Sequence, residues 1–532
     1  MAIGLFLHGL LGLKTRKSRR DSVSKKELVE GPGEILKVGF AFWPSKVLLT
    51  AIELKLFTHL AKSQSQRMTN AEICAALKLH ERATPDFTDV LVSLHFLERE
   101  GNGADALYFN TPEVDMYLVE EKDTYIGESL IKVSTATYPS VVDLKKILTK
   151  TGSDIRTIGE LRGACMTDAR IRVLRAKQVK AITKAQGKLS AKHIIEIALA
   201  FWPSRCLLVA TDMQLFTKIK QNGGQMSKRD ICEETGIRKS KSTLFLETLV
   251  ECGVLGRTGS KAEAVYYNMP NTSAFLDKTV SEMYVGGILE MASLRLYRFW
   301  KDLREALETG MMQNESKESG WNDFFPNLYR QPESLASFME AMVGISSGHF
   351  RKFAIAFDFS KYRTCIDIGG ATGQLSCYVA QENSHMRCTT LDLPPVKPIA
   401  EQWINKVWEC SHRVKAGNID FLAHPFPKAD VVLMAMILHD WGYKEKMMLI
   451  KKAYDALPPG GALVSLESVI DDDRRMNTHG MCMSLNMLIE FGCYGGYDFT
   501  HADFDKWCLS AGFRKTVLMP LAGPSSAVIA YK

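Results

Sequence analysis

The stretch whose residue types point most directly to chemistry is Ile366–Leu375, which reads IDIGGATGQL. A short apolar run carrying Asp367 leads straight into three glycines, Gly369, Gly370 and Gly373. Glycines let a backbone approach a ligand closely, and the apolar segment that restarts at Leu375 predicts a helix with free N–H groups at its positive end. About twenty residues later, Asp392 ends a second short run, where an acid can accept hydrogen bonds from ribose hydroxyls.

Further polar side chains follow predicted strands. His439 and Asp440 follow the apolar run Val431–Leu438, Glu467 follows Leu463–Leu466, and Asp420 precedes Phe421 in a loop. Histidine is the usual general base near neutral pH. A His–Asp pair at the end of a buried strand favours this role over a surface ion pair. The glycine turn alone fits either a dinucleotide enzyme or a methyltransferase.

The elements that must position these residues begin near Phe324. Strands are expected at Thr364–Ile368, Arg387–Leu391, Asp430–Leu438, Ala462–Ser468 and Ser526–Tyr531. Helices are expected at Leu335–Phe350, Leu375–Gln381, Val396–Trp408, Lys444–Ala456 and Asp503–Ala511. This alternation predicts an α/β fold with a doubly wound, Rossmann-like parallel sheet, whose ligands bind at the carboxyl ends of the strands.

The preceding part of the chain contains a repeat. Phe42-Trp43-Pro44-Ser45 recurs as Phe201-Trp202-Pro203-Ser204, and four-residue or shorter matches follow at the same offset of 158 or 159 positions. Each copy predicts a long apolar helix broken near its proline (Ile35–Leu60, Ile194–Ile219), a helix-turn-helix with Thr69 or Ser227 as N-cap, and a small β-wing. We therefore expect two mainly α, winged-helix-like domains before the sheet.

The charges argue against DNA binding by these domains. The expected second helices, Asp86–Leu97 and Ser242–Leu255, contain acids but no lysine or arginine. A recognition helix needs positive charge against phosphate, so a packing or dimerisation module is the better interpretation. The second copy adjoins the sheet domain in sequence and is expected to cover its site, whereas the first copy is expected to pack on the second and imitate a partner's module.

Composition sets outer limits. The chain has 532 residues, a net charge of +7 and 46% hydrophobic residues, as in a multidomain globular protein. Its twelve cysteines show no regular spacing, which argues against a disulfide framework or a zinc site, and no metal is expected. We expect no membrane span, since no apolar run is predicted to approach the roughly 20 residues that one requires. The basic N-terminal segment fits either a tail, with a cytoplasmic location, or a mitochondrial or plastid transit segment.

The expected domains follow from these observations. They are a basic tail or targeting segment, the first repeat, a helical linker, the second repeat and the catalytic domain, at residues 1–32, 33–152, 153–192, 193–322 and 323–532.

The order of motifs in the last part resembles class I S-adenosylmethionine-dependent O-methyltransferases of the acetylserotonin (hydroxyindole) and caffeate type. The motifs are Ile366–Gly373, Leu391-Asp392-Leu393-Pro394, Pro425–Asp430, Leu438-His439-Asp440-Trp441, Leu457–Gly461 and Ala511-Gly512-Phe513. The resemblance covers about Ile194–Lys532, because those enzymes have one dimerisation domain before the catalytic domain.

The resemblance implies roles for particular residues. His439 would be the general base, with Glu467 and Asp498 orienting it. S-Adenosyl-L-methionine would contact Tyr329, Asp367, Gly369, Gly370, Gly373, Asp392, Leu393, Asp420 and Phe421. Asp392 would bind the ribose, and Asp420 with Phe421 the adenine. The resemblance implies a small-molecule acceptor. It also implies a homodimer, or a monomer if the internal repeat satisfies the dimer interface. Neither nucleic acid nor a membrane is expected as a partner.

Departures from the family pattern leave the acceptor open. Ser346 replaces a tryptophan, Ala435 replaces a basic residue, and Asp498 replaces a glutamate after a longer loop. Five methionines near the expected pocket could grip a flat acceptor or simply fill the core: Met434, Met436, Met481, Met483 and Met487. The leading hypothesis is methyl transfer to a hydroxyl of a small aromatic molecule. The alternatives are S-methylation of a thioether acid such as methylthiohydroxybutyrate, and a non-catalytic winged-helix regulator.

Overall fold

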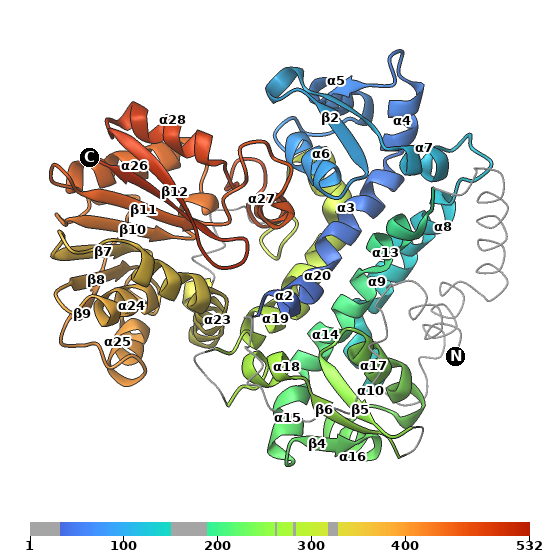
Figure 1. Ribbon diagram of the computed structural model, residues 1–532, viewed down its shortest axis with the longest axis horizontal. Helices are drawn as coiled ribbons and strands as arrows, with labels where there is room; N and C mark the ends of the chain where they lie inside the picture. The colour runs from blue at the N-terminus through green and yellow to red at the C-terminus, as the bar shows by residue number, and fades with distance from the viewer. Residues whose placement is uncertain (1–31, 150–188, 261–262, 280–282, 318–327) are drawn as a thin grey trace, which may run out of the picture. The chain divides into compact units, whose positions relative to one another are not determined.

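A computed structural model of the chain describes residues 32–149, 189–260, 263–279, 283–317 and 328–532 (Figure 1). The expected linker, residues 153–192, and the basic segment, residues 1–32, lie almost wholly outside this part. The chain divides into two compact units. The first comprises Met1–Thr69, His95–Glu100 and Leu107–Lys301, and the second comprises Asn70–Leu94, Gly101–Ala106 and Asp302–Lys532. A helical piece of the first copy thus belongs to the same unit as the sheet domain.

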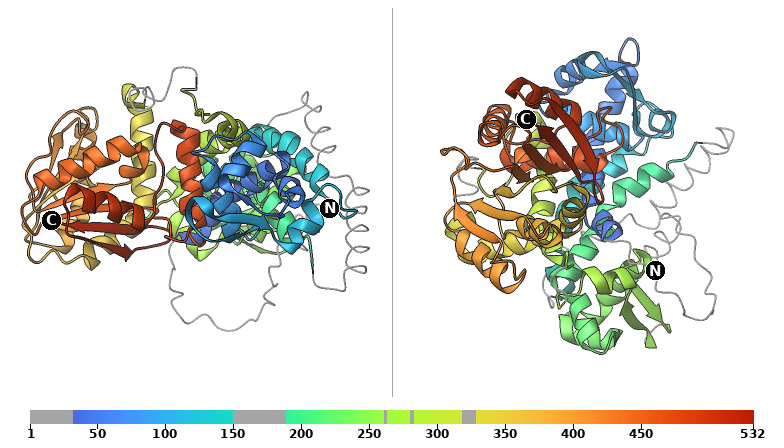
Figure 2. Two further views of the ribbon diagram at one scale, coloured as in Figure 1. Left: turned by 90° about the horizontal axis from the view of Figure 1, so that it is seen from above. Right: turned by 60° about the vertical axis from the view of Figure 1, so that its left-hand side comes forward.

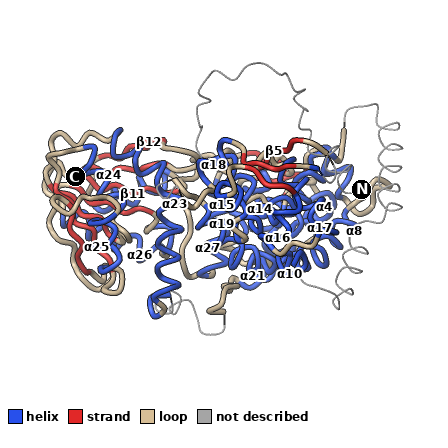
Figure 3. The backbone as a smooth tube through the Cα atoms, turned by 90° about the horizontal axis from the view of Figure 1, so that it is seen from below, coloured by secondary structure: helices blue, strands red, loops and turns tan. Residues whose placement is uncertain are grey.

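The first unit is mainly helical and contains corresponding elements from both copies (Figure 3). From the first copy come α2 (Gly33–Gly39), α3 (Phe42–Glu53), α4 (Leu56–Lys62), α7 (Pro112–Leu118), α8 (Gly127–Lys132), α9 (Tyr138–Ser140) and α10 (Leu144–Thr149). From the second come α13 (Lys192–Leu199), α14 (Phe201–Asp212), α15 (Leu215–Gln221), α16 (Lys228–Thr235), α17 (Lys239–Glu251), α18 (Pro270–Phe275), α19 (Gly286–Met291) and α20 (Tyr297–Phe299).

Each copy also has the expected wing, a small antiparallel sheet. The strands are β1 (Met68–Thr69), β2 (Leu97–Glu100) and β3 (Leu107–Asn110) in one, and β4 (Gln225–Ser227), β5 (Leu255–Thr258) and β6 (Val265–Asn268) in the other, ordered β1-β3-β2 and β4-β6-β5. Ser227 caps α16 through a capping box with Asp230, as predicted. The long first helix is broken just before Phe42 and again at Lys55, so Pro44 lies in the first turn of α3, where its missing N–H costs nothing.

The two copies make reciprocal contacts inside the first unit. The Ser45 hydroxyl donates to the carbonyl of Ala198 at 2.8 Å, and the matching Ser204 hydroxyl donates to the carbonyl of Gly39 at 2.6 Å. The ring of Tyr138 stacks on that of its counterpart Tyr297, with centroids 4.5 Å apart. Contacts of the form i-to-j and j-to-i define an isologous interface, which symmetric dimers ordinarily form between two chains.

Two helical segments of this unit correct one expectation. Gly33–Glu53 and Lys192–Asp212 are long and apolar enough to cross a membrane by length and composition. However, 72% and 67% of the most apolar part of these segments, respectively, is buried inside the protein. They are also the segments through which the two copies pair, which accounts for their hydrophobicity without a bilayer.

The second unit is built on a seven-stranded sheet ordered β12-β13-β11-β10-β7-β8-β9, seen from two further sides in Figure 2. The strands are β7 (Thr364–Ile368), β8 (Arg387–Asp392), β9 (Val414–Asn418), β10 (Val431–Ala435), β11 (Ala462–Glu467), β12 (Lys515–Pro520) and β13 (Ser526–Tyr531). Five are parallel, but β13 runs antiparallel to β11, and β12 antiparallel to β13, so the sheet is mixed. β9 and β12 were not predicted: β9 is short and contains Lys415, Gly417 and Asn418, and β12 is bounded by Lys515 and Pro520.

The helices of this unit are α5 (Asn70–Leu77), α6 (Thr84–Ser93), α21 (Leu303–Thr309), α23 (Pro332–Ala356), α24 (Gln374–Glu382), α25 (Lys397–Lys406), α26 (Tyr443–Ala456), α27 (Thr478–Phe491) and α28 (His501–Ala511). Side chains of β10 alternate between two cores: Val431 and Leu433 pack with α24, whereas Val432 and Met434 pack with α26 and α28. Helices on both faces make the doubly wound architecture that the sequence predicts.

Helix α27 was not predicted, and it receives contacts from both copies. It packs against α6 from the first copy and against α21 from the end of the second. Within this unit the larger contribution to α27 comes from the first copy. Helix α27 does not line the pocket described for this unit, so the prediction that the second copy covers the site stays a prediction. The His80 amide of the first copy also donates to the carbonyl of Leu307 in α21, at 2.7 Å.

Candidate active site

The glycine turn joins β7 to α24 and is held by close contacts. A Cβ on Gly370 would lie 2.2 Å from the Thr390 hydroxyl oxygen and 2.8 Å from the carboxyl of Asp367, so no other residue fits there. Gly373 precedes α24 with a left-handed backbone and does not line the pocket described below. The backbone thus passes directly over the ends of β7 and β8, where ligands of doubly wound sheets bind.

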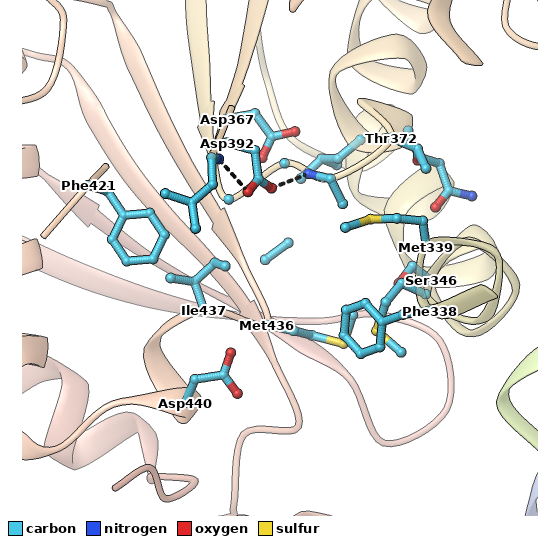
Figure 4. A pocket seen from close by; sticks show the side chains of 18 of the residues that line it. Phe338, Met339, Ser346, Asp367, Thr372, Asp392, Phe421, Met436, Ile437 and Asp440 are labelled. Atoms are coloured by element: carbon cyan, nitrogen blue, oxygen red, sulfur yellow. Dashed lines mark hydrogen bonds between the residues drawn. The ribbon is translucent and has the colours of Figure 1, made fainter. Parts of the chain in front are cut away.

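Asp392 ties the end of β8 to this turn. One carboxylate oxygen accepts from the Leu393 amide at 2.7 Å, and the other from the Ala371 amide at 3.0 Å (Figure 4). Burial raises the pKa of Asp392 to about 6, although these two hydrogen bonds lower it. Each oxygen keeps a second lone pair for a ligand donor, so the carboxylate is oriented by the protein and still able to accept.

Asp367 lies beside it in the sheet. The Ser376 hydroxyl donates to one of its oxygens at 3.1 Å, and the other oxygen has no hydrogen-bond partner among the described residues. Burial raises the pKa of Asp367 to about 7. A buried acceptor of this kind, facing a pocket, is suited to a ligand that brings a positively charged or N–H group.

A single pocket contains most of the expected cofactor residues. Its lining includes Tyr329, Asp367, Gly369, Gly370, Asp392, Leu393, Asp420 and Phe421. Figure 4 shows the two acids on one side, with Phe338, Met339 and Met436 across from them and Phe421 at one end. Asp420 is exposed and accepts from the amides of Leu422 and Ala423, so it shapes its loop. The cavity therefore offers a glycine cradle, acceptors and apolar walls together.

Helix α23 supplies a wall of which the sequence had pointed only to Ser346. Phe338, Met339, Met342 and Ser346 from this helix line the pocket. Of the five methionines predicted to lie near it, Met436 lines it, whereas Met434 and Met481 are fully buried in the core. The signal for α23 was its apolar periodicity, which does not distinguish a core face from a pocket wall.

His439 lies in a 3-10 turn, Leu438–Asp440, because β10 ends at Ala435, earlier than expected. Its Nδ1 is 3.5 Å from Asp498 and 4.0 Å from Glu467, and its Nε2 is 3.4 Å from Asp440. Glu467 is fixed in turn by the Leu438 amide and the Ser465 hydroxyl, at 3.1 and 3.0 Å. The structure thus brings together all three residues of the expected catalytic group.

The electrostatics of this cluster favour a proton on the histidine. Burial lowers the pKa of His439, but Asp440, Glu467 and Asp498 outweigh it and raise that pKa to about 10. Burial also raises the pKa of Asp440 to about 6 and that of Glu467 to about 7, and it raises that of Asp498. Ligand atoms of His439, Glu467 and Asp498 lie within 4.8 Å of one another, so spacing alone would also admit a metal ion.

Sequence reasoning missed Lys446 in α26, which is fully buried. Its ammonium donates to the carbonyls of Trp441 and Tyr497 at 2.6 and 2.9 Å and lies 3.4 Å from the centre of the Tyr497 ring. Burial lowers the pKa of Lys446 to about 7, although nearby acids raise it. This lysine connects the loop after His439 to the loop that carries Asp498.

Comparison with known proteins places these features in a family. A model of the O-methyltransferase domain matches residues 300–514, and one of the O-methyltransferase dimerisation domain matches twice, at 36–120 and 195–278. The chain is 33% identical over 339 residues to the tetracenomycin polyketide synthesis 8-O-methyl transferase TcmO of Streptomyces glaucescens, covering 64% of this chain and 96% of that protein.

Two solved structures agree. Human N-acetylserotonin methyltransferase in complex with SAM is 26% identical, with a TM-score of 0.59 over 64% of this chain and 96% of that one. An O-methyltransferase family 2 protein from Planctomyces limnophilus, in complex with apigenin, is 15% identical with a TM-score of 0.54. That second match covers 94% of this chain and 96% of that one, and it shows likeness of fold alone.

The cofactor of the family fits the pocket of this chain. The glycine cradle, the oriented carboxylate of Asp392, the unpartnered oxygen of Asp367 and the aromatic Phe421 offer acceptors and apolar surface to an amino-acid, ribose and base group in one cavity. The chain belongs to the S-adenosylmethionine-dependent O-methyltransferase family and is a methyltransferase.

Proposed function

We propose that this enzyme methylates a hydroxyl of a small aromatic molecule and that His439 is the general base. The observation that carries the proposal is the placement of His439: two buried acids face Nδ1, and Asp440, which lines the cofactor pocket, is next to Nε2. The relatives named for a polyketide 8-hydroxyl and for N-acetylserotonin support an aromatic acceptor.

The chain's own residues account for the proton. When bound, S-adenosylmethionine supplies a methyl group activated on a sulfonium centre. Asp498 and Glu467 favour the tautomer with hydrogen on Nδ1, which leaves the Nε2 lone pair to accept the hydroxyl proton of the acceptor. The three acids raise the pKa of His439 to about 10, so the imidazole must first lose its own proton before it can act as a base. The unprotonated form then takes the proton of a phenol, whose pKa is also near 10.

The cofactor roles of the pocket residues belong to the same proposal. Asp392 would bind the ribose hydroxyls, Phe421 would face the adenine, and the turn at Gly369 and Gly370 would cradle the methionine part. Tyr329, whose pKa is raised by burial beside Asp392 and Asp440, would close the pocket from the segment before α23.

The test is a transfer assay with labelled cofactor against phenols, naphthols, indoles, amines and thioether acids. Phenolic acceptors should be methylated, and His439→Ala should lower kcat by about 10²–10⁴-fold, the usual contribution of a general base, while cofactor affinity stays unchanged. Full activity of His439→Ala would contradict the base. Methylation of thioether acids alone would indicate S-methylation, since a thioether has no proton to lose. A chelator should have no effect; its inhibition would indicate a metal at the three residues.

The pH dependence gives a second readout of the base. Turnover should rise with pH as His439 loses its proton, through an apparent pKa above the ordinary value near 6.5. Asp498→Asn removes a carboxylate that stabilises the imidazolium, so it should move this apparent pKa downwards. An unmoved profile would show that another group limits the rate.

We further propose that the two copies satisfy the dimerisation interface inside one chain, so that the enzyme works as a monomer. The reciprocal bonds of Ser45 and Ser204 and the stacked Tyr138 and Tyr297 support this, because they use each copy's matching surface on the other. Light scattering on purified protein should give a mass close to the 59.5 kDa of the chain. A dimer at all concentrations would reject internal pairing as a substitute for the second chain.

A further inference from the structure

Helix α6 brings a buried carboxylate of the first copy to the catalytic unit. Asp86, in the first turn of α6, is 5% exposed and accepts from the Ser484 hydroxyl of α27 at 2.7 Å. The same Ser484 oxygen accepts from the backbone amide of Asp498 at 3.3 Å. A continuous hydrogen-bonded path thus runs from Asp86 to the residue whose carboxylate faces His439.

Two arginines hold Asp86 in place. Arg82 donates to it at 2.8 Å, and Arg474 pairs with both Asp86 and Asp89. Burial raises the pKa of Asp86, but these arginines and the Ser484 hydrogen bond lower it below its ordinary range, so the group is charged at neutral pH. A charged acceptor makes the stronger kind of hydrogen bond, which orients the serine hydroxyl.

Arg82 holds the two residues before Asp498. Its guanidinium donates to the Gly496 carbonyl at 3.3 Å and lies 4.6 Å from the centre of the Tyr497 ring. From the other side, Lys446 donates to the Tyr497 carbonyl at 2.9 Å. A Cβ on Gly496 would lie 2.0 Å from the His439 carbonyl oxygen, so this segment packs directly on the backbone of His439.

We propose that Asp86 and Arg82 of the first copy are positioning residues, which fix residues 496–498 and thereby hold the Asp498 carboxylate against His439. The inference rests on the proposed function of His439. The first copy then contributes to catalysis, because its helix α6 holds the loop that carries Asp498.

The second copy does not carry this pair. At the offset of 158 that aligns the helices, Asp86 corresponds to Leu244 and Arg82 to Ser240. The matched acid one turn on, Glu247, accepts instead from Arg257 and Tyr266 of its own wing. Asp86 and Arg82 are therefore specific to the first copy, whose helix α6 packs on α27.

The experiment compares a graded series in the full-length enzyme. Asp86→Leu gives the first copy the residue of the second, Asp86→Asn keeps an acceptor without the charge, and Ser484→Ala removes the bridge alone. Glu247→Gln is the matched control in the second copy. Each variant is assayed for kcat, acceptor KM, cofactor affinity by calorimetry and deuterium exchange of the peptide around Asp498.

We expect faster exchange at the Asp498 amide and a kcat lowered about ten- to hundredfold in Asp86→Leu and Ser484→Ala, with cofactor affinity unchanged, because a displaced Asp498 misplaces the base. Asp86→Asn should be intermediate and Glu247→Gln unaltered. The pH–rate profile of Asp86→Leu should shift toward acid, as in Asp498→Asn. If Asp86→Leu does not fold, Ser484→Ala and Asp86→Asn still decide.

The outcomes separate the two proposals. Unchanged exchange at Asp498 in the series overturns the positioning role, whatever the activity. Faster exchange with unaltered kcat and pH profile, while His439→Ala is inactive, also overturns it. Full activity of His439→Ala overturns the general base itself and is independent of the exchange result.

Discussion

Helices α6 and α17 hold matching positions in the two copies but bind different partners. In α6, Asp86 and Asp89 pair with Arg474 of the catalytic unit. In α17, Glu247, the counterpart of Asp89, pairs with Arg257 and Tyr266 of its own wing. The same fold therefore supports two uses, and the difference depends on a few charged side chains on one helix face.

The apolar helices of the two copies depend on each other for burial. Their apolar helices form reciprocal contacts, so each buries what the other would leave exposed. Their helix-turn-helix parts have different partners: α6 packs on α27 within its own unit, whereas Glu247 of α17 pairs with Arg257 of its own wing. The two copies are therefore alike at the interface they share, and differ in charge on the helices that meet different partners.

The largest expected difference between the copies is at the interface tryptophan. Trp43 is 1% exposed and stacks on Trp300 at 5.4 Å, whereas its counterpart Trp202 is only half-buried. Trp43→Ala should cost about 3–5 kcal/mol of unfolding free energy, as for other buried large-to-small changes, and Trp202→Ala clearly less. Denaturant unfolding measures both. Equal losses would mean that the two tryptophans share one environment.

A smaller difference is expected for the arginines that pair with the helix acids. Arg474→Met leaves the buried Asp86 and Asp89 without their shared cation and should cost about 2–3 kcal/mol, less than for a fully buried pair because the side chain is 22% exposed. Arg257→Met, at a pair that is more exposed, should cost under about 1 kcal/mol. Thermal unfolding of the two variants side by side checks the ratio, and a reversed order would contradict the assignment of partners.

The serines test where the copies should behave alike. Ser45→Ala and Ser204→Ala each remove one buried hydroxyl bond to a carbonyl of the opposite copy and should each cost about 1 kcal/mol. The double variant should be close to the sum, since the two bonds share no atoms. A large loss from one and none from the other would show that the interface is not reciprocal in solution.

The smallest expected effect is an acid-dependent one. The pKa of Asp86 is lowered in the folded state by Arg82, Arg474 and Ser484, so its contribution is present above its unfolded pKa and is lost as pH falls through the folded value. The gap in melting temperature between the natural enzyme and Asp86→Asn should therefore be constant at neutral pH and close below about pH 4. A gap that widens in acid would contradict a charge-stabilised Asp86.

Much of the catalytic fold could be predicted because its signals are local. β7 and β13 have the predicted bounds, and α24 starts one residue before its predicted start. The mixed edge of the sheet could not be predicted, because β12 becomes a strand by pairing with β13 and its own sequence carries no clear strand pattern. The early end of β10 also depends on a neighbouring strand. Met436 has a positive φ, and its amide donates to the carbonyl of Leu466, so the strand stops before His439.

The sequence by itself determined the family and the glycine turn, and it predicted that Asp392 and the three residues at His439 belong to the site, because glycine spacing and ordered motifs report local strand–turn–helix chemistry. It also predicted the pairing of two similar halves. Only the tertiary structure decided that Asp86, 398 positions before Ser484, belongs to the same network as Asp498. Sequence periodicity cannot predict this contact, because the partner of the Asp86 carboxylate is fixed only when distant helices pack together.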